Sequence, residues 1–264
     1  MCSNRKGFLC MSIYSVINMD IVGSRELTNR VEIQEKLKNY FITLYEDYKN
    51  IFVAPITFTL GDEWQLVLRD VKRSYDIFLL IKTFLLKYNI EIYCGIGIGK
   101  ISTKESDDTR EMDGEAFIYA RNALISAKAT NTFYNKQLYT KDCKIIINGP
   151  STTSNRIQNE TYNEYSIGEL EVAVTADEDC LELLDLINTL IQNNEMIENN
   201  TTDKQKQIIR LYEAFGSYSE IEKAYPGYTR SSISRKLAAS NYFLSIHNKE
   251  VVKSLLNKYV AVFK

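Results

Sequence analysis

Acidic residues end two β-type segments of this 264-residue chain. Asp20 ends the apolar run 12–19, whose composition is typical of a central strand. Asp62 and Glu63 lie at the tip of the segment 55–69, where a Gly-Asp pair between two β-type runs is a strong hairpin signal. If the first strand and the hairpin are neighbours in one sheet, the three carboxylates converge. They then repel one another unless a proton or a cation neutralises them.

Oxygen donors of this kind favour Mg²⁺ or Mn²⁺, which bind through one or two carboxylates together with substrate phosphates. We therefore predict a metal site made by Asp20, Asp62, Glu63 and the backbone carbonyl of Ile21. Two metal ions there would activate a 3′-hydroxyl and stabilise a pyrophosphate leaving group, so the three acidic residues are also the catalytic candidates if the protein is an enzyme. The alternative is structural, with Asp20 as a strand terminator and Gly61-Asp62 as a simple hairpin turn.

The loop after the first strand suits phosphate binding. Gly23 allows a phosphate to approach the backbone closely, and Arg25 supplies positive charge. We expect the nucleotide-binding residues to include Gly23, Ser24 and Arg25 of this loop and Gly61 of the hairpin.

Periodicity places these residues in an alternating α+β pattern. The expected elements are a strand at 12–19, a helix at 26–50, the hairpin at 55–69, a helix at 72–87, a strand at 90–101 and a helix at 115–129, with further β-type runs at 143–148 and 164–174. This order predicts a ferredoxin-like βαββαβ palm domain. The first helix should bury a stripe that includes Val31, Leu37, Phe41 and Leu44.

Glycines alternate along the strand at 90–101, at Gly95, Gly97 and Gly99. A dinucleotide-binding loop would need a tight turn that opens a helix, whereas this segment continues as β-type sequence. We therefore expect the glycines to let another backbone approach the strand.

The bulk composition predicts a soluble cytoplasmic protein. No apolar run is long enough to span a membrane, and residues 1–10 lack a signal-peptide core. Because Met11 directly precedes the first strand, residues 1–10 are expected to be a disordered extension, or the product of a misassigned start. Five scattered cysteines without metal-type spacing favour a reducing compartment. The single histidine, His247, excludes a His-rich metal site and is expected at the surface.

The C-terminal part has the opposite charge from the rest. Residues 201–264 hold 11 of the 32 Lys+Arg and 5 of the 34 Asp+Glu, a net charge of +6, which leaves 21 and 29, or −8, for the remainder. Such asymmetry points to a nucleic-acid partner, although chance clustering of surface charge is the alternative. The domains expected are a palm at 11–176, a connector helix and linker at 177–200, and a helix-turn-helix at 201–264. The helix is expected at 178–192, and the Asn-rich linker at 192–203.

Three short helices are expected at 204–215, 218–225 and 229–240, and a fourth from about 249. In the third, Ile233 and Leu237 face inward and leave a polar, basic face outward. Small hydroxyl residues with arginines behind them suit entry into the major groove of duplex DNA and clamping of phosphates. The residues expected to contact DNA are Arg230, Ser231, Ser232, Arg235 and Lys236. A helical packing module is the alternative, and the helix at 178–192 offers a contact for a homodimer.

Several short motifs resemble known families. Asp20-Ile21-Val22-Gly23-Ser24 resembles the first metal motif of class III nucleotidyl cyclases, and Leu60-Gly61-Asp62-Glu63-Trp64 resembles both their second motif and the signature of diguanylate cyclases. The run from Ala123 to Lys128 is similar to a late helix of diguanylate cyclases, which implies that Lys128 approaches a phosphate. Together with the C-terminal helices, the chain most closely resembles the SatD family of bacterial proteins over about residues 12–250.

Positions that read the base or stabilise the transition state in those cyclases differ here. Phe58 stands where class III cyclases have a purine-reading lysine, and Ile118 and Asn122 replace their asparagine and arginine. The guanine-reading positions of diguanylate cyclases fall on Thr28 and Leu37. The resemblance thus favours a nucleotide- and metal-binding regulator of transcription that binds DNA. An active nucleotidyl cyclase or transferase and a catalytically dead adaptor are the alternatives.

Overall fold

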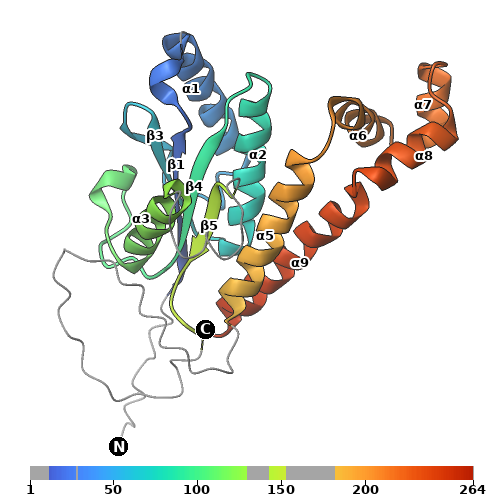
Figure 1. Ribbon diagram of the computed structural model, residues 1–264. Coiled ribbons are helices and arrows are strands. Elements are labelled where there is room, and N and C mark those ends of the chain that lie inside the picture. Colours follow the sequence, from blue (N-terminus) through green and yellow to red (C-terminus); the bar gives the residue numbers. More distant parts are fainter. Residues whose placement is uncertain (1–11, 28, 130–142, 153–181, 264) are drawn as a thin grey trace, which may run out of the picture.

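The computed structural model describes residues 12–27, 29–129, 143–152 and 182–263 (Figure 1). Within these ranges the chain forms an α+β unit, residues 14–150, followed by an all-helical region. The expected extension at 1–10, the β-type run at 164–174 and Thr28 lie outside the described residues. Among the helices that the structure does describe, none has the length and apolarity that a bilayer crossing demands.

Five strands pair in the order β2-β3-β1-β4-β5. All neighbours are antiparallel except β4 and β5, which are parallel. The strands are β1 (Tyr14–Ile21), β2 (Thr57–Leu60), β3 (Glu63–Leu68), β4 (Ile92–Gly99) and β5 (Ile145–Asn148). Within the described residues the expected strands, the hairpin and their order along the chain are confirmed, and β1 lies between β3 and β4.

One face of the sheet is covered by α1 (Arg30–Asp47) and α2 (Ser74–Leu86), which follows the short 3-10 helix η2 (Val71–Arg73). The buried stripe of α1 includes Leu37, Phe41 and Leu44, as expected. Val31 was wrongly assigned to that stripe, because its side chain is 72% exposed and Ile33 is buried instead. Since α1 begins at Arg30, Val31 belongs to its first turn and lies beyond the edge of the core.

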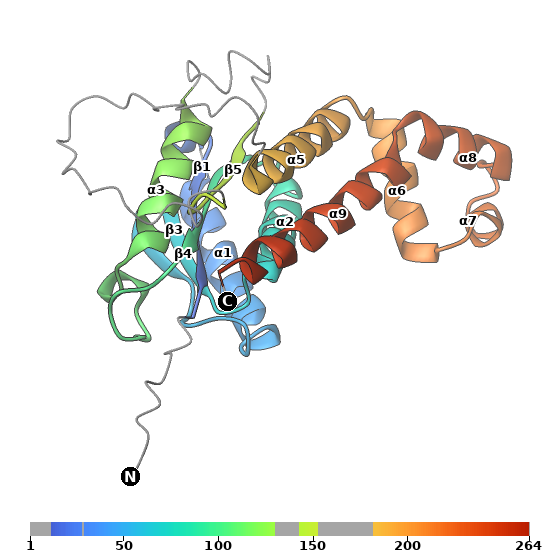
Figure 2. The ribbon, with the colours of Figure 1, turned by 90° about the horizontal axis from the view of Figure 1, so that it is seen from below.

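The other face is covered by α3 (Glu115–Lys128), which follows the 3-10 helix η3 (Thr109–Glu111) and packs directly on β4 (Figure 2). A Cβ added to Gly95 would lie 2.2 Å from a backbone atom of α3, and one added to Gly97 would lie 2.1 Å from another. Side chains at these positions are therefore sterically excluded, and the expected close approach of a second backbone to this strand is confirmed.

Helix α5 (Leu183–Asn199) continues through the Asn-rich residues that were expected to form a linker, so the linker prediction is wrong for residues 192–199. Tertiary contacts override the low helix propensity of asparagine. Asn194 and Glu195 are buried, and Asn188 bonds to both backbone groups of Ile147 on the outer edge of β5, at 2.9 Å each. These contacts attach α5 to the sheet and satisfy the outward-facing backbone groups of Ile147.

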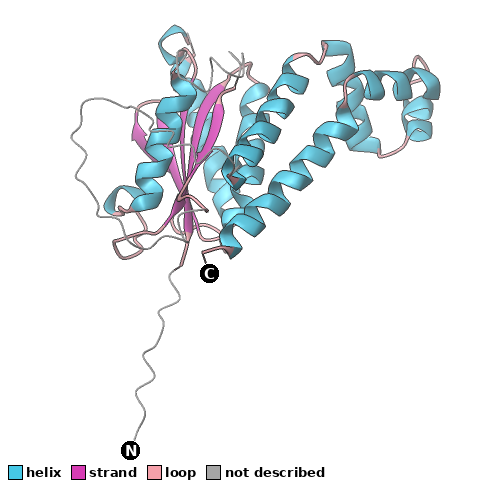
Figure 3. Ribbon diagram, turned by 60° about the horizontal axis from the view of Figure 1, so that its bottom comes forward, coloured by secondary structure: helices cyan, strands magenta, loops and turns pink. Residues whose placement is uncertain are grey.

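Helices α6 (Asp203–Phe215), α7 (Tyr218–Ala224) and α8 (Arg230–Ala239) form a small bundle with its own core of Ile208, Ile221, Ile233 and Leu237. Helix α9 (Tyr242–Ala261) begins seven residues before the expected start at 249 and returns to the sheet, where Val252, Leu256 and Tyr259 join the main core. Figures 2 and 3 show α5 and α9 side by side, with the bundle extending away from the sheet.

Candidate functional site

Asp20 and Glu63 are directly opposite each other in the antiparallel β1–β3 pair. Side chains opposite each other in such a pair share one face of the sheet and have Cβ atoms about 4.5–5.5 Å apart. Here that face is the one on which α3 lies, because its last-turn residue Lys128 places Nζ 2.5 Å from Oδ2 of Asp20. The Asp20 and Lys128 side chains are 18% and 36% exposed, so the ion pair is accessible to solvent. We call Asp20 and Glu63 the carboxylate row.

Asp62 lies in the turn between β2 and β3 and interacts with a different cation. Its Oδ1 is 3.7 Å from a guanidinium nitrogen of Arg30, at the start of α1. Gln34 of the same helix donates a hydrogen bond to the carbonyl of Gly61, which fixes the turn against α1. Across the described ranges, no three His, Cys, Asp or Glu side chains gather closely enough to hold a metal ion. The structure thus brings two of the three predicted carboxylates together.

The loop after β1 makes a tight turn. Gly23 has φ +64°, a left-handed conformation that favours glycine, and precedes the 3-10 helix η1 (Ser24–Glu26). Arg25 is exposed. Ile21 is buried and pairs with Ile92 of β4, and the preceding residue, Asp20, pairs with both β3 and β4. The phosphate-binding role of Gly23, Ser24 and Arg25 stays a prediction.

A second polar pair, which the sequence reasoning missed, lies beside the carboxylate row. Asn18 of β1 is opposite Gln65 of β3, and Nε2 of Gln65 donates a hydrogen bond of 2.9 Å to Oδ1 of Asn18. The hydroxyl of Thr59 donates to the Glu63 side chain at 3.4 Å. The available signal was the pair of amide residues inside otherwise apolar strands. We call Asn18 and Gln65 the amide row.

Positions that read the base in the cyclases are structural here. Phe58 packs its ring 5.7 Å from that of Phe41 and 6.2 Å from that of Trp64, in the aromatic cluster beneath the sheet. Leu37 is fully buried in α1. Neither side chain can hydrogen-bond to a base, as the substitutions predicted.

The chemistry of the donors is compatible with a divalent cation. Two carboxylates on adjacent strands offer hard oxygen ligands, and few protein ligands suffice for Mg²⁺ when phosphates and waters complete its shell. The Lys128 ammonium already supplies positive charge to Asp20. Asp20 and Glu63 are therefore suited to hold a divalent cation, as predicted. Asp62 could join them only if its ion pair with Arg30 were broken.

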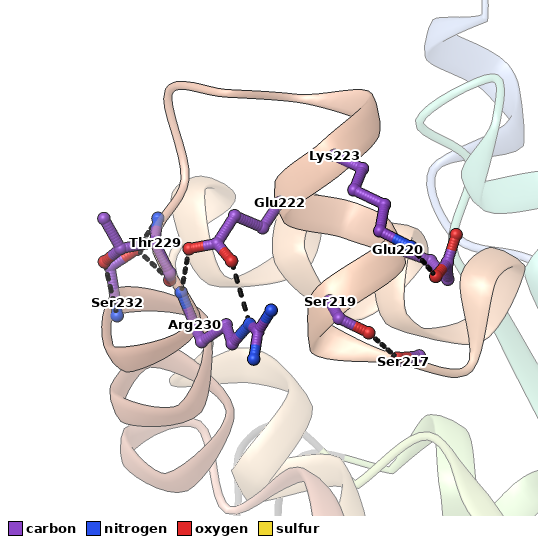
Figure 4. A network of polar contacts seen from close by, with 8 residues as sticks. All are labelled: Ser217, Ser219, Glu220, Glu222, Lys223, Thr229, Arg230 and Ser232. Atoms are coloured by element: carbon purple, nitrogen blue, oxygen red, sulfur yellow. Dashed lines mark hydrogen bonds and ion pairs between the residues drawn. The ribbon is translucent and has the colours of Figure 1, made fainter.

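The C-terminal bundle has the geometry of two helices joined by a turn. In Figure 4, Arg230 at the start of α8 pairs with Glu222 of α7, with Nε 2.8 Å from Oε2. Thr229 caps α8 in a reciprocal capping box with Ser232. Ile233 and Leu237 are buried, as expected.

The outward face of α8 keeps several donors near solvent. Ser231 and Arg235 are exposed, and Nε of Arg235 donates to the carbonyl of Ser231 at 3.3 Å. Nζ of Lys236 lies 4.9 Å from the centre of the Tyr228 ring. Of the five predicted DNA contacts, Arg230 pairs with Glu222, Ser232 with Thr229 and Arg235 with the carbonyl of Ser231. Arg230, Ser231 and Arg235 are nevertheless exposed.

Comparison with protein families gives a match for the sheet region. The SatD family model matches residues 14–160, more than half of the chain. The chain belongs to the SatD family. No curated protein matches it. The SatD match includes β1 to β5, and thus both rows, but ends before α5 and the C-terminal bundle.

Proposed function

We propose that the sheet domain of this SatD protein binds a nucleotide with Mg²⁺ or Mn²⁺ beside the carboxylate row, and that the C-terminal bundle binds duplex DNA. The observation that carries the first part is the placement of Asp20 opposite Glu63, with Lys128 against Asp20. Like charges directly opposite in a sheet are destabilising unless a cation compensates. A partly exposed pair of this kind, retained in the centre of a sheet, is suited to ligand binding.

The topology supports the comparison with cyclases. The order β2-β3-β1-β4, with antiparallel neighbours throughout, is the order of a ferredoxin-like βαββαβ palm. In this arrangement the end of the first strand lies beside the hairpin, which is where both families of cyclase place their metal motifs. We therefore assign the domain to the nucleotidyl-cyclase-like palms.

Each residue has a defined part in the proposed binding. Asp20 and Glu63 would hold the cation, and the cation would neutralise the phosphates. Gly23 leaves room for a phosphate at the loop, and Arg25 and Lys128 supply positive charge. When a cation takes over Asp20, Lys128 is released towards the phosphates.

Binding without turnover is favoured by the positions that differ from the cyclases. Phe58 and Leu37 are core residues and offer no base-reading group. Ile118, at a position where class III cyclases stabilise the transition state, is 58% exposed and has no polar side-chain atom. An active nucleotidyl cyclase or transferase is the second candidate, because the carboxylate row is retained.

Calorimetric titration of the full chain with each nucleoside triphosphate and Mg²⁺ tests the sheet domain. We expect binding that requires the cation and that falls at least about tenfold in Asp20→Asn, since one charged ligand is lost. Asp47→Asn, at the exposed end of α1, is the matched control and should bind normally. If the wild type binds no nucleotide, the catalytically dead adaptor is the remaining alternative. Release of pyrophosphate that disappears in Asp20→Asn would make the protein an enzyme.

The proposal for DNA rests on charge and exposure. The segment 201–264 carries a net +6, and α8 presents Ser231 and Arg235 outward from a buried three-helix core. Phosphate contacts by such side chains make affinity fall with salt.

Fluorescence anisotropy with a labelled duplex at increasing salt tests this part. We expect Arg235→Ala to weaken binding and to reduce the salt slope by about one unit, as for the loss of one phosphate contact. Lys258→Ala, exposed on α9 far along the chain from α8, should leave both unchanged. If the duplex does not bind, or if its affinity does not respond to salt, DNA binding through α8 is excluded.

A further inference from the structure

Two polar rows lie next to each other on the face of the sheet that α3 only partly covers. The pair Asn18–Gln65 is two residues from the pair Asp20–Glu63 along both strands. Since side chains alternate along a strand, all four project from the same face, with the rows roughly 7 Å apart. The next pair, Val16–Val67, is fully buried beneath α3 and η3, so the polar surface ends there.

The amide row is oriented by its internal hydrogen bond. One N–H of the Gln65 amide is used by Asn18, which is only 5% exposed and therefore a fixed anchor. Gln65 itself is partly exposed. A glutamine amide has two N–H donors and one carbonyl acceptor, so one donor and the acceptor remain for a ligand.

A purely structural account of this row is weak. Cross-strand pairs contribute about 0.2–1 kcal/mol, and an apolar pair would serve as well or better beside α3. The change from a buried valine pair to an amide pair, of which Gln65 is partly exposed, occurs one step before the carboxylates. Thr57, opposite Gln65 on β2, extends the polar row towards the edge of the sheet.

We propose that Gln65, positioned by Asn18, binds the base of the nucleotide whose phosphates lie at the carboxylate row. This inference rests on the proposed nucleotide function and adds the residue that recognises the base. A side-chain amide pairs in a bidentate manner with a base edge that presents a donor next to an acceptor, as glutamine does with adenine. The spacing of the rows leaves room for the ribose between base and phosphates. Asn18 is the positioning residue.

The decisive experiment compares ligands that share phosphates but differ in the base. The full chain is titrated with ATP, GTP, CTP, UTP and inorganic tripolyphosphate, each with Mg²⁺, by calorimetry. Gln65→Met keeps the length of the side chain and removes both hydrogen-bonding groups. We expect it to weaken the best nucleotide about tenfold, as for one lost pair of hydrogen bonds, and to leave tripolyphosphate unchanged. Gln207→Met, exposed on α6, is the control and should change neither.

A second variant tests the positioning role. Asn18→Ala frees Gln65 without touching the ligand, so it should reduce the ratio of nucleotide to tripolyphosphate affinity by a smaller factor than Gln65→Met. A merely structural role would lower both affinities together. If the nucleotides bind the wild type and Gln65→Met equally, the base assignment is wrong and the proposed function stands. If neither nucleotides nor tripolyphosphate bind the wild type, both fail.

Discussion

A buried ion network fastens the helix pair that carries the C-terminal bundle. Nζ of Lys82, on α2, lies 2.5 Å from a carboxylate oxygen of Glu195 and 2.7 Å from one of Glu198, both on α5. Lys249 of α9 reaches Glu198 at 3.3 Å. The Lys82 side chain is 17% exposed and that of Glu195 is 7% exposed. One ammonium therefore joins the sheet domain to α5 where water has little access.

Replacing Lys82 with methionine keeps the apolar stem and removes the charge. Taking away one partner of a buried ion pair costs about 3–5 kcal/mol, because the other charge stays buried without compensation. Since Lys82 retains some contact with water, we expect the free energy of unfolding to fall by about 3 kcal/mol. For a chain of this length, that lowers the Tm by roughly 6–12 °C. Lys104→Met, on an exposed loop, should change the Tm little.

The pH dependence of the stability lost in Lys82→Met identifies the cause of that loss. Burial alone would lower the pKa of Lys82, but the two glutamates outweigh it and raise the pKa, so the ammonium stays charged. Burial raises the pKa of Glu195. A carboxyl whose folded pKa is raised favours the fold at low pH and opposes it as pH rises. The penalty of Lys82→Met should therefore be larger at about pH 8 than at about pH 5.

Urea unfolding followed by circular dichroism measures these differences. Adding Glu195→Gln to Lys82→Met removes the stranded charge and should recover part of the lost stability. A loss below about 1 kcal/mol for Lys82→Met, the value typical of exposed ion pairs, would refute the assignment of this network as a buried attachment. So would a penalty that does not change with pH.

Three further outcomes are expected. A Cβ at Gly97 would lie 2.1 Å from the backbone of α3, so Gly97→Val should destabilise the fold by about 3 kcal/mol or more, and a normal Tm would contradict this packing. Hydrogen bonds from Arg69 hold the pKa of Glu105 in the folded protein below its usual range. Glu105 therefore stabilises the fold at pH values above its pKa in the unfolded chain, and this contribution is lost as the pH falls through its pKa in the folded protein. Glu105→Gln should therefore narrow the difference in urea midpoint between about pH 7 and about pH 3, and an unchanged difference would argue against it. Burial raises the pKa of the Cys143 thiol to about 12 and that of Cys94 well above its usual value. Both thiols should resist iodoacetamide in the folded protein, as read by peptide mass spectrometry, and rapid alkylation would be inconsistent with their burial.

Local patterns predicted the elements well where burial follows a simple period. The strand before Asp20 and the hairpin that contains Glu63 were identified because apolar runs stop at glycine and acidic residues. The position of the Asp62 side chain relative to the sheet could not be predicted in this way. A shift of one residue in a hairpin moves a side chain to the other face or into the turn, and register depends on the paired strand. Asp62 falls in the turn beside Arg30, whereas Glu63 begins β3.

The helical region shows the limit of sequence reasoning more clearly. The segment at 192–199 has the composition of a linker, but Asn194 donates to the carbonyl of Ser245, and Glu195 pairs with Lys82. Likewise Asn248 bonds to Asn194, so the buried face of α9 begins with polar residues that no apolar period reveals. Helix propensity is weak beside such tertiary contacts. Partners distant along the chain decide these elements.

These contacts also connect the sheet domain to the C-terminal bundle. The C-terminal bundle is inserted between α5 and α9, with only residues 200–202 and 240–241 as connections. Both helices are anchored in the sheet domain. Asn188 of α5 bonds to the backbone of β5, and Val252 and Leu256 of α9 pack in the main core. Connections this short do not act as flexible tethers. If a nucleotide on the sheet domain altered DNA binding, the effect would have to pass through these anchored helices, and the ion pairs of Lys82 with α5 lie at that contact.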